Sequence, residues 1–341
     1  MLEIDGSYLE GGGQIIRTSV ALSAITAKPI RITNIRKGRD NPGLMTQHIE
    51  AVNALAQLCN AEIKGLEKGS TILEFHPREI NARTIDITIS TAGSVALVLQ
   101  GLMFAALHAD NTIEINVKGG ATSGKWAAPA NFVKNVLLPI LEKMNYKAQL
   151  NVLKYGYYPK GGSEILMSIT PTELKSINLL ERSKLIRIKG ISHASSLLKS
   201  KNVAERMRSS AENLLKKEGF ESDIEIRYVD TICHGCGIEL FATYENTILG
   251  SDGLGELQRS AESVGKEAAE KLIQYHKSNA CMDPHVTDQI LPYIAIAAKN
   301  GESKISVSEI TNHCKTNIWV IEKFLPVKFS IKDNVIECRK I

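Results

Sequence analysis

The order of the predicted elements constrains the fold more than any other feature of this sequence. The order strand, helix, strand, helix, strand, strand is expected over residues 2–75 and again over residues 85–169. The expected strands are residues 2–5, 30–35, 61–64, 71–75, 85–89, 112–117, 147–153 and 164–169, and the expected helices are residues 14–26, 43–59, 93–108 and 128–144. Two consecutive units of roughly 80 residues with one element order predict an internal structural repeat.

The element order changes after about residue 183. Up to residue 276 we expect strands at 185–191, 223–228 and 238–244, helices at 201–217 and 257–276, a solvated loop at 192–201 and a glycine-rich loop at 250–255. The earlier order then resumes with helices at 290–299 and 317–324 and strands at 305–307, 327–331 and 335–338. A chain of 341 residues exceeds the usual size of one domain.

These patterns predict an α/β fold of three repeated βαβαββ-type units, with helices packed on one face of each sheet. A small α/β insert domain would interrupt the last unit. We therefore expect one domain from residues 1–182 and 277–341, and an insert domain from residues 183–276.

Charge and hydropathy exclude several classes of protein. The net charge of +4 and the pI near 8.6 are compatible with an anionic substrate, but they are far from a dedicated nucleic-acid patch. No apolar run approaches the length of a membrane-spanning helix, and the N-terminus lacks the apolar region of a signal peptide. We expect a cytoplasmic protein with no membrane partner.

The six cysteines include one closely spaced pair, Cys233 and Cys236, with His234 between them. Such a pair could bind a metal or undergo redox chemistry. No second pair completes a four-ligand zinc site, however, and the surrounding glycines indicate a hairpin turn. The role of the pair stays open.

The polar segment around His313 is the first candidate for chemistry. It is expected to be a turn between a strand and a helix over residues 317–324, which Pro326 ends. A His close to a helix N-terminus is held neutral and nucleophilic by the helix dipole, and the same backbone N–H groups attract a phosphate. Transfer of a phosphoryl or nucleotidyl group to a ring nitrogen needs this combination. The plain alternative is a hydrogen-bonded structural His.

The triple glycine at residues 11–13 is a second candidate, because glycines before a helix let a phosphate approach the backbone closely. Gln14 and Arg17 share one side of that helix. Glu10 precedes the glycines and could hold a hydrated divalent cation. A tight turn, a solvated Arg and a surface Glu are the alternatives.

A basic loop with Arg36 and Arg39 leads to Asn41-Pro42, which we interpret as the start of the helix over residues 43–59. Basic residues before a helix indicate an anion site, and surface solvation is the alternative. His48 lies at the end of the apolar stripe of that helix and could equally be a core residue. Near residue 288, Asp288 and Gln289 could bond a nucleobase or ribose, whereas Asp283 or Thr287 fits a helix cap.

Together these segments resemble the RNA 3′-terminal phosphate cyclase family, in order and over essentially the whole length. The matching segments are EGGGQIIR (residues 10–17), IRKGRDNPGL (35–44), Gln47-His48, GSVALVLQ (93–100), the loop from Gly119-Gly120 to Ala128-Pro129, YYPKGGSE (157–164), TDQILP (287–292) and HCKTNIWVIEKFLP (313–326).

The resemblance implies an ATP-dependent ligase-type reaction in three steps. A His attacks the α-phosphorus of ATP, releasing diphosphate and forming a His–AMP intermediate. AMP then passes to the 3′-terminal phosphate of an RNA. The vicinal 2′-OH finally attacks that phosphate, giving a 2′,3′-cyclic phosphate and AMP. The RNA 3′-phosphate is a poor electrophile, and adenylylation gives it AMP as a good leaving group before the 2′-OH of the same ribose attacks.

The resemblance also assigns site residues, within a catalytic domain of repeated units. It makes His313 the nucleotidylated residue and Glu10 the ligand of Mg²⁺ or Mn²⁺. Phosphate or RNA binding falls to Gln14, Arg17, Arg36, Arg39, Gln47 and His48, and nucleotide binding to Gln100, Pro129, His285, Val286, Thr287, Asp288 and Gln289.

One position departs from the family pattern. Many members have a Tyr against adenine where this chain has His285, whose ring offers less stacking area. Adenine affinity and selectivity for ATP over GTP are therefore open at this position. The family is compatible with a homodimer, although no residue in the sequence identifies an interface.

Two other readings compete. The first is a non-catalytic cyclase-like factor that binds RNA in ribosome assembly; members of that branch lack the nucleotidylated His, whereas His313, Glu10 and Arg39 are all present here. The second is an enolpyruvyl transferase built from related units, which would not need a His in this turn.

Overall fold

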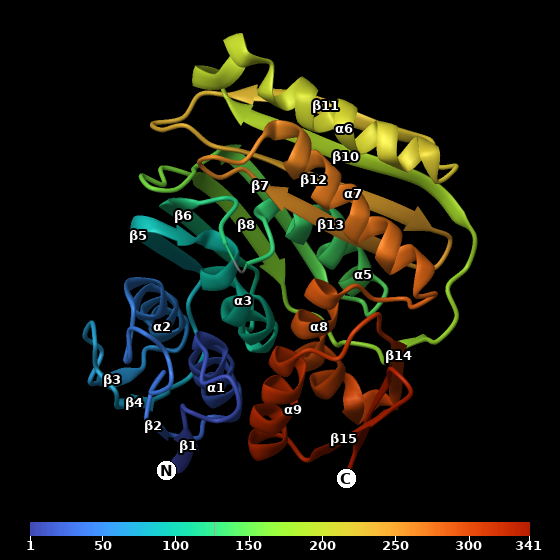
Figure 1. The fold of residues 1–341 in the computed structure, drawn as a ribbon. Helices are drawn as coiled ribbons and strands as arrows, with labels where there is room; N and C mark the ends of the chain where they lie inside the picture. Colours follow the sequence, from blue (N-terminus) through green and yellow to red (C-terminus); the bar gives the residue numbers. More distant parts are fainter. Residues whose placement is uncertain (126) are drawn as a thin grey trace.

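The computed structural model describes residues 1–125 and 127–341 and has the expected mixed α/β fold (Figure 1). In this part of the chain the named strands form four-stranded sheets, and three of the sheets share one topology. The orders of those three are β1-β2-β4-β3, β5-β6-β8-β7 and β9-β14-β16-β15. In each, the first two strands run parallel and the remaining pairs run antiparallel.

The bounds of the elements follow the chain. The first sheet and its helices are β1 (Leu2–Asp5), α1 (Gly13–Thr26), β2 (Ile30–Thr33), α2 (Thr46–Cys59), β3 (Glu62–Lys64) and β4 (Leu73–His76). The second group is β5 (Thr84–Ser94), α3 (Val95–Ala105), η1 (Ala106–His108), β6 (Ile113–Ala121), α4 (Ala130–Phe132), η2 (Val133–Leu137), α5 (Leu138–Glu142), β7 (Lys147–Lys154) and β8 (Glu164–Thr170). The third group is β9 (Asn178–Leu179), α8 (Pro284–Ala297), η4 (Ala298–Asn300), β14 (Ser303–Ser306), α9 (Asn312–Phe324), β15 (Val327–Lys332) and β16 (Val335–Lys340).

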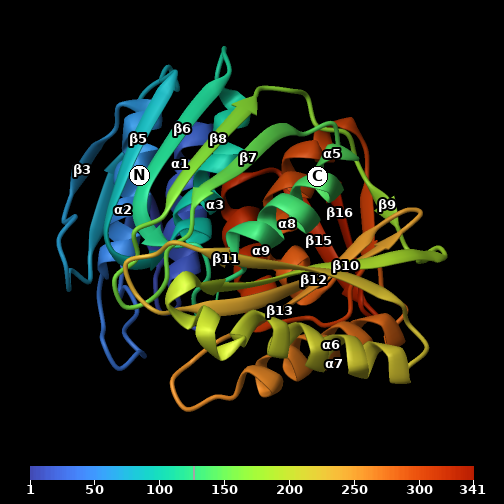
Figure 2. The ribbon, with the colours of Figure 1, turned by 90° about the horizontal axis from the view of Figure 1, so that it is seen from above.

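A further sheet, β11-β10-β12-β13, comes from the chain between β9 and α8. Its elements are β10 (Leu185–Ser195), η3 (Ser196–Lys201), α6 (Val203–Lys217), β11 (Ser222–Val229), β12 (Cys236–Tyr244), β13 (Ile248–Leu254) and α7 (Ala261–Lys277). Helices α6 and α7 cover its outer face (Figures 1 and 2). This group buries an apolar cluster of its own, with Met207, Leu240 and Leu272 at its centre.

The helices of the first three groups meet in the interior, with their sheets outside. Helix α1 packs against α2, α3 and α9, and α8 packs against α9. Their apolar faces share one large buried cluster that includes Val20, Leu55, Leu102 and Val320. The N-terminal ends of α1 and α9 thereby come from distant parts of the sequence into one region, which positions the candidate site.

Several helices begin at other residues than the sequence pattern predicts. Helix α8 begins at Pro284 rather than at residue 290, because Asp283 caps it, and α7 begins at Ala261 rather than at residue 257.

Asn41-Pro42 does not start a helix, and α2 begins at Thr46. Gly43 has φ +81 and donates its N–H to Ile35, while a Cβ there would meet the backbone of Gly69 at 2.2 Å. This tertiary pairing keeps the segment in a loop.

Helix α9 begins at Asn312 rather than at residue 317, because Thr311 caps it. The Thr311 hydroxyl accepts the N–H of Cys314 at 2.9 Å, which satisfies one of the free donors of the first turn. His313 therefore belongs to the first turn of a helix and not to a preceding turn.

Two expected loops are also corrected. Residues 192–195 continue strand β10 and residues 196–201 form the short helix η3, so this segment is not a solvated loop; Ser192 and His193 are fully buried. Residues 250–254 lie in strand β13. The glycines there reflect close packing, since a Cβ at Gly250 would lie 2.3 Å from the Phe132 ring.

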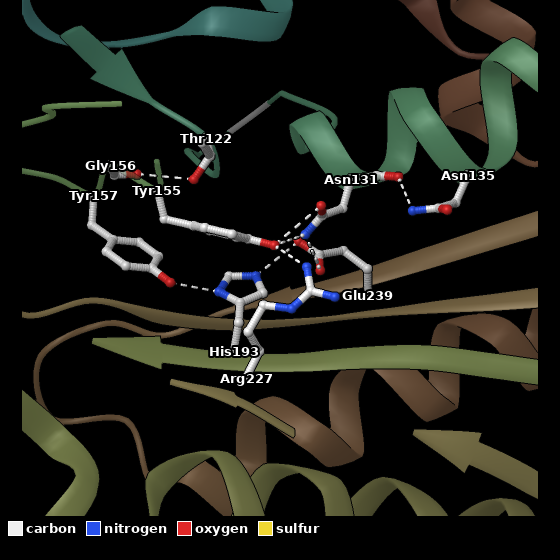
Figure 3. Close-up of polar contacts among 9 residues, drawn as sticks. All are labelled: Thr122, Asn131, Asn135, Tyr155, Gly156, Tyr157, His193, Arg227 and Glu239. Carbon is white, nitrogen blue, oxygen red and sulfur yellow. Dashed lines mark hydrogen bonds and ion pairs between the residues drawn. The ribbon is translucent and has the colours of Figure 1, made fainter. Parts of the chain in front are cut away.

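A buried polar network joins β10 and β12 to the second group (Figure 3). His193 Nδ1 lies 2.6 Å from the Tyr157 hydroxyl, and its Nε2 lies 3.0 Å from Glu239 Oε1. Asn131 of α4 donates to the other oxygen of Glu239 at 3.2 Å. Both side chains of this contact, His193 and Glu239, are almost wholly inaccessible to solvent. Each polar group has a partner across the junction, so the network orients the two parts.

Among the described residues, no helix is both long enough and apolar enough to cross a bilayer.

Candidate active site

The loop between β1 and α1 brings Glu10 to the N-terminal end of α1. The N–H of Gly11 donates to the Tyr8 carbonyl at 2.9 Å, closing a turn, and Gly12 is the N-cap of α1. Gly13 is packed so closely that a Cβ would lie 2.1 Å from His48 Nε2 and 3.0 Å from Arg17 Nη1. Glycine is thus required there because two polar side chains occupy the space.

His313 lies in the first turn of α9 and faces this loop. Its Nδ1 is 2.9 Å from Glu10 Oε2, and Arg39 Nη2 is 3.8 Å from the same oxygen. The His313 side chain is 45% exposed, so the ring remains accessible. The structure thus brings together three residues that the sequence places far apart.

The environment of His313 favours the neutral ring. Burial lowers its pKa; the Glu10 carboxylate opposes that effect, while the positive charges of Arg17 and Arg39 add to it. The pKa of His313 therefore lies below its ordinary value. A neutral imidazole in a helix N-terminal turn is the form that can act as a nucleophile.

Arg17 is a buried cation without a carboxylate partner in the described chain. Its residue is only 7% exposed, and its Nε donates to Gln100 Oε1 at 3.1 Å. Burial lowers the pKa of Arg17 to about 10. Because an unpaired charge is costly to bury, this position favours an anion such as a phosphate.

His48 is held as a neutral neighbour of that cation. The N–H of Met45 donates to His48 Nδ1 at 3.0 Å, which directs Nε2 towards Gly13 and Arg17. Burial, with the charges of Arg17 and Arg36, lowers the pKa of His48 to about 3. With Nδ1 accepting, Nε2 carries the proton and can donate to an anion.

Two predicted site residues hold the surrounding loops. Arg36 donates to the carbonyl of Gly43 at 3.1 Å and to that of Asn41, so its guanidinium partly secures the basic loop. Gln47 is half-buried in the first turn of α2, where it adjoins Gly93.

The oxygens near the triple glycine suit a hard cation. Glu10 Oε2 and Gln14 Oε1 are both buried, and neither accepts a well-aligned hydrogen bond within the described residues, although Glu10 Oε2 lies 2.9 Å from His313 Nδ1. Carboxylate and amide oxygens are ligands that Mg²⁺ and Mn²⁺ accept. The described residues contain no cluster of three or more His, Cys, Asp or Glu side chains suited to a metal, so other ligands would be water or substrate oxygens. Together with water or substrate oxygens, Glu10 and Gln14 therefore fit the Mg²⁺ or Mn²⁺ that the sequence analysis expects.

The N-terminal turn of α8 lies on the other side of the site. Asp283 is its N-cap, as the sequence allowed, and accepts N–H groups from Val286 at 3.0 Å and Gly250 at 2.9 Å. Burial raises the pKa of Asp283 to about 6. This residue joins α8 to strand β13, so its role is structural.

His285 presents a partly exposed ring beside Phe132. The ring centroids are 5.2 Å apart in an edge-to-face contact, and Phe132 lies in α4, whose N-cap is Pro129. His285 Nε2 lies 3.1 Å from Asp252 Oδ1. Burial alone would lower the pKa of His285, but the Asp252 bond and nearby carboxylates, Asp288 among them, outweigh it and raise the pKa.

The remaining predicted nucleotide residues differ in accessibility. Val286 and Thr287 are fully buried, so their side chains support α8 from within. Asp288 accepts from the Thr311 hydroxyl at 2.5 Å, which ties α8 to the cap of α9, and burial raises the pKa of Asp288 to about 7. Gln289 donates to the carbonyl of His285 at 3.1 Å.

Two contributors escaped the sequence analysis. Asp252, the partner of His285, lies in a segment that its glycines marked as a loop, so no signal pointed to it. Thr311 lies two residues before His313, and a Thr that precedes a helix is a cap signal. The helix start was misplaced, which hid that role.

The cysteine pair lies where the chain passes from β11 to β12, which are separated by β10 in the sheet, so the expected hairpin turn is not formed. Cys233 is buried and its thiol donates to the Tyr157 carbonyl at 3.3 Å. Burial raises the pKa of Cys236 to about 11, which disfavours the thiolate that metal binding or redox exchange requires.

Comparison with known proteins supports one family. The model of the family described as RNA 3′-terminal phosphate cyclase matches residues 8–331. The chain is 42% identical over 340 residues to the RNA 3′-terminal phosphate cyclase of Methanopyrus kandleri, covering 97% of this chain and 95% of that protein. Proteins of the same name from Pyrobaculum aerophilum and Pyrococcus abyssi are 43% and 42% identical, over 96% and 98% of this chain and 94% and 96% of theirs.

Proposed function

This chain belongs to the RNA 3′-terminal phosphate cyclase family, and we propose that it converts an RNA 3′-terminal phosphate to a 2′,3′-cyclic phosphate with consumption of ATP. One observation carries the proposal. A neutral, accessible His313 lies in a helix N-terminal turn, 2.9 Å from Glu10, in a region that the buried charge of Arg17 makes favourable for anions.

In the first step, His313 Nε2 attacks the α-phosphorus of ATP. Nδ1 faces Glu10, so Nε2 is the nitrogen left free for bond formation. The N–P bond forms as the bond between the α-phosphorus and the bridging oxygen breaks, and diphosphate leaves. The positive charge that develops on the ring is stabilised by the carboxylate of Glu10.

Arg17, Arg39 and His48 would bind the phosphate groups. Arg17 and His48 converge on Gly13, and Arg39 adjoins Glu10, so cationic or donor groups approach from three elements. Bound at Glu10 and Gln14, Mg²⁺ or Mn²⁺ would neutralise phosphate charge and make the α-phosphorus more electrophilic. Such binding would also remove the effect that raises the pKa of His313, and so favour its neutral form.

The two later steps use the same residues. An oxygen of the RNA 3′-phosphate attacks the α-phosphorus, the N–P bond breaks and His313 is regenerated. The vicinal 2′-oxygen then attacks the 3′-phosphorus, losing its proton, and AMP departs. Because both reacting groups belong to one ribose, the protein mainly has to orient them and neutralise charge.

We infer that Pro129 and His285 flank the adenine and that the fully buried Phe132 supports the His285 ring from inside the protein. The contact between Phe132 and His285 and the exposure of the His285 ring support this assignment. His285 in place of the Tyr of many family members would then stack with its Asp252-bound ring. Gln100, Asp288 and Gln289 would act as polar neighbours of the nucleotide.

We also infer that the first three sheets are copies of one unit and that the fourth is an insert in the last copy. The shared strand order and pairing directions support the repeat, and the separate apolar cluster around Met207 supports the insert.

The rival function is a non-catalytic RNA-binding factor of the same family. The accessibility of His313 and its contact with Glu10 favour the enzyme, because a scaffold needs neither.

The test is conversion of defined RNA ends. A single-stranded RNA with a 3′-phosphate, ATP and Mg²⁺ should yield a phosphatase-resistant end and one AMP per end. An RNA whose terminal nucleotide lacks the 2′-OH should stop at the adenylylated end, because the last nucleophile is missing. His313→Ala should abolish both reactions, and the exposed residue His234 offers a matched control, His234→Ala.

No conversion by the wild-type protein, or full conversion by His313→Ala, would contradict the proposed function.

A further inference from the structure

A stacked aromatic pair lies beside the candidate active site. The rings of Tyr8 and Trp319 have centroids 4.0 Å apart and an interplanar angle of 10°. Tyr8 belongs to the loop before α1, and Trp319 belongs to α9. The same loop therefore contacts the same helix twice, through Glu10 with His313 and through Tyr8 with Trp319.

This pair remains accessible to solvent. Tyr8 is 36% exposed and Trp319 is half-buried, and the neighbouring Leu9 is 53% exposed, whereas a pair that only joins two elements would normally be buried. Leu9 has φ 48°, a left-handed conformation that is unfavourable for leucine. Strained backbone of this kind gathers at functional sites.

Two lysines flank the aromatic pair on the helix surface. Lys315 and Lys323 are four residues before and after Trp319, so all three share one face of α9. Both lysines are exposed, and neither forms an ion pair within the described residues. Lys323 Nζ lies 4.6 Å from the centroid of the Trp319 ring, a cation–π contact.

The aromatic pair lies near the nucleophile along both elements, although Trp319 and His313 point about 120° apart around the axis of α9. Tyr8 and Glu10 are two residues apart, so their Cα atoms are at most about 7 Å apart. Along α9, Trp319 is six residues after His313, or about 9 Å along the helix axis. A polynucleotide whose 3′-phosphate reaches His313 can therefore lie against these rings with its last nucleotides.

We propose that Tyr8, Trp319, Lys315 and Lys323 form a binding surface for the terminal nucleotides of single-stranded RNA. This inference rests on the proposed function, since it assigns a place to the chain that carries the 3′-phosphate. The terminal base stacks on the aromatic pair and the lysines neutralise backbone phosphates. Stacking on aromatic rings accepts any base, so this surface selects an unpaired end rather than a sequence.

The decisive experiment compares an RNA that has its terminal base with an otherwise identical RNA that is abasic at that nucleotide. In wild-type protein, loss of the base should raise KM for cyclisation roughly 5- to 150-fold, the range expected for one stacked base. Tyr8→Ala should raise KM similarly for the RNA with the base and change it little for the abasic RNA. Tyr8→Phe keeps the ring and should restore the wild-type KM.

A second measurement tests the lysines. Binding of the 3′-phosphorylated RNA should weaken with salt, and Lys315→Ala or Lys323→Ala should each reduce the slope of log affinity against log salt by about 0.7. Lys217→Ala, an exposed lysine of α6, should leave the slope unchanged. Binding is measured directly by fluorescence anisotropy, so this test does not require turnover.

Adenylylation of His313 by ATP without RNA separates this inference from its alternatives. Tyr8→Ala should impair RNA binding far more than adenylylation. Equal impairment of both would show that the pair only holds Glu10 in place, and an unchanged KM in Tyr8→Ala would also overturn the inference. If the wild-type protein is not adenylylated but the anisotropy effects appear, the proposed function fails while the RNA surface stands.

Trp319→Ala removes a larger side chain, so Trp319→Phe serves as the variant that preserves folding. It should weaken binding less than Tyr8→Ala, because a smaller ring still supports the Tyr8 ring. If Trp319→Phe binds the RNA less tightly than Tyr8→Ala does, the base does not stack on Tyr8 with Trp319 as its support.

Discussion

Glu10 Oε2 lies 2.9 Å from His313 Nδ1, which joins the loop after the first strand to the helix that begins at Asn312. The same oxygen is buried and accepts no well-aligned hydrogen bond in the described chain. Glu10 can therefore orient the ring and still bind a cation. A Glu10 carboxylate that contacts the ring favours the protonated form of His313, whereas a Glu10 that binds a cation favours the neutral form. The first prediction follows from this competition.

Glu10→Gln should shift the pH dependence of adenylylation to lower pH. The Glu10 carboxylate opposes the lowering of the His313 pKa by burial, so its removal lowers that pKa further. Activity needs the neutral ring and is lost as pH falls through the pKa, so the variant should retain its relative rate at more acidic pH. Its maximal rate should fall because a metal ligand is lost. The measurement is the adenylylation rate from pH 5 to 8 at limiting Mg²⁺, where the Glu10 carboxylate is largely free of metal. An acid limb that moves to higher pH, or stays in place, would contradict this assignment.

Arg17→Met should stabilise the protein and impair its reaction with ATP. The variant removes a buried, unpaired cation, which should raise the free energy of unfolding by about 1–3 kcal/mol. It should also lower kcat/KM for ATP on the order of 100-fold, because a donor to the phosphates is lost. Urea unfolding and steady-state kinetics measure the two effects.

Arg208→Met is the control for the second prediction, since Arg208 is only half-buried on α6 and its Nε lies 3.6 Å from a carboxylate oxygen of Glu212. It should change stability by less than about 0.5 kcal/mol. Diphosphate should stabilise the wild-type protein against unfolding more than it stabilises Arg17→Met. A destabilised Arg17→Met variant with normal kinetics would show that Arg17 does not hold an anion.

Asp252→Asn should move the pH dependence of ATP binding to lower pH. Asp252 holds the His285 ring by a contact of 3.1 Å, and with Asp283 and Asp288 it raises the His285 pKa against the effect of burial. A protonated His285 attracts the nucleotide, so affinity should weaken as pH rises through this pKa. In Asp252→Asn that loss should begin at lower pH. Calorimetric titration with a non-hydrolysable ATP analogue measures it.

His285→Tyr is the matched variant for the third prediction. It has no charge to lose and a larger ring, so it should bind the analogue at least as tightly at pH 8 and should remove this part of the pH dependence. A pH profile of His285→Tyr that is identical to that of the wild type would place the titrating group elsewhere.

His193→Ala should strongly destabilise the protein. It leaves the buried Glu239 side chain with only the Asn131 amide as a partner, which costs roughly 3–5 kcal/mol. Arg206→Ala is the comparison: it breaks an ion pair with Glu262 that is exposed on both sides and should cost less than about 1 kcal/mol. Urea unfolding separates the two, and equal losses would mean that the network in Figure 3 does not fix the junction.

Much of the fold follows from local pattern. The strand at Leu2–Asp5 and the helix after the triple glycine have the predicted places because alternation and helical periodicity are local properties. The glycines of β13 misled the prediction, since they reflect a neighbour: Gly250 is a strand residue that packs against the Phe132 ring. No property of residues 248–254 alone reveals this contact.

The candidate site was predictable in its parts but not in its geometry. The residue types around Glu10 and His313 pointed to phosphate chemistry, and the family resemblance ordered them. Spacing in the sequence could not reveal that Arg17 is buried without a carboxylate, or that Asp252 supports His285. Both depend on tertiary packing between elements distant in sequence.

The most direct measurement is the site of covalent labelling by ATP. The protein is incubated with α-labelled ATP and Mg²⁺ without RNA, denatured, and digested for mass spectrometry. The account predicts one AMP on the ring of His313, stable in base and lost in acid, with release of diphosphate and no label in His313→Ala. An unlabelled wild-type protein, or label on any other residue, would contradict it.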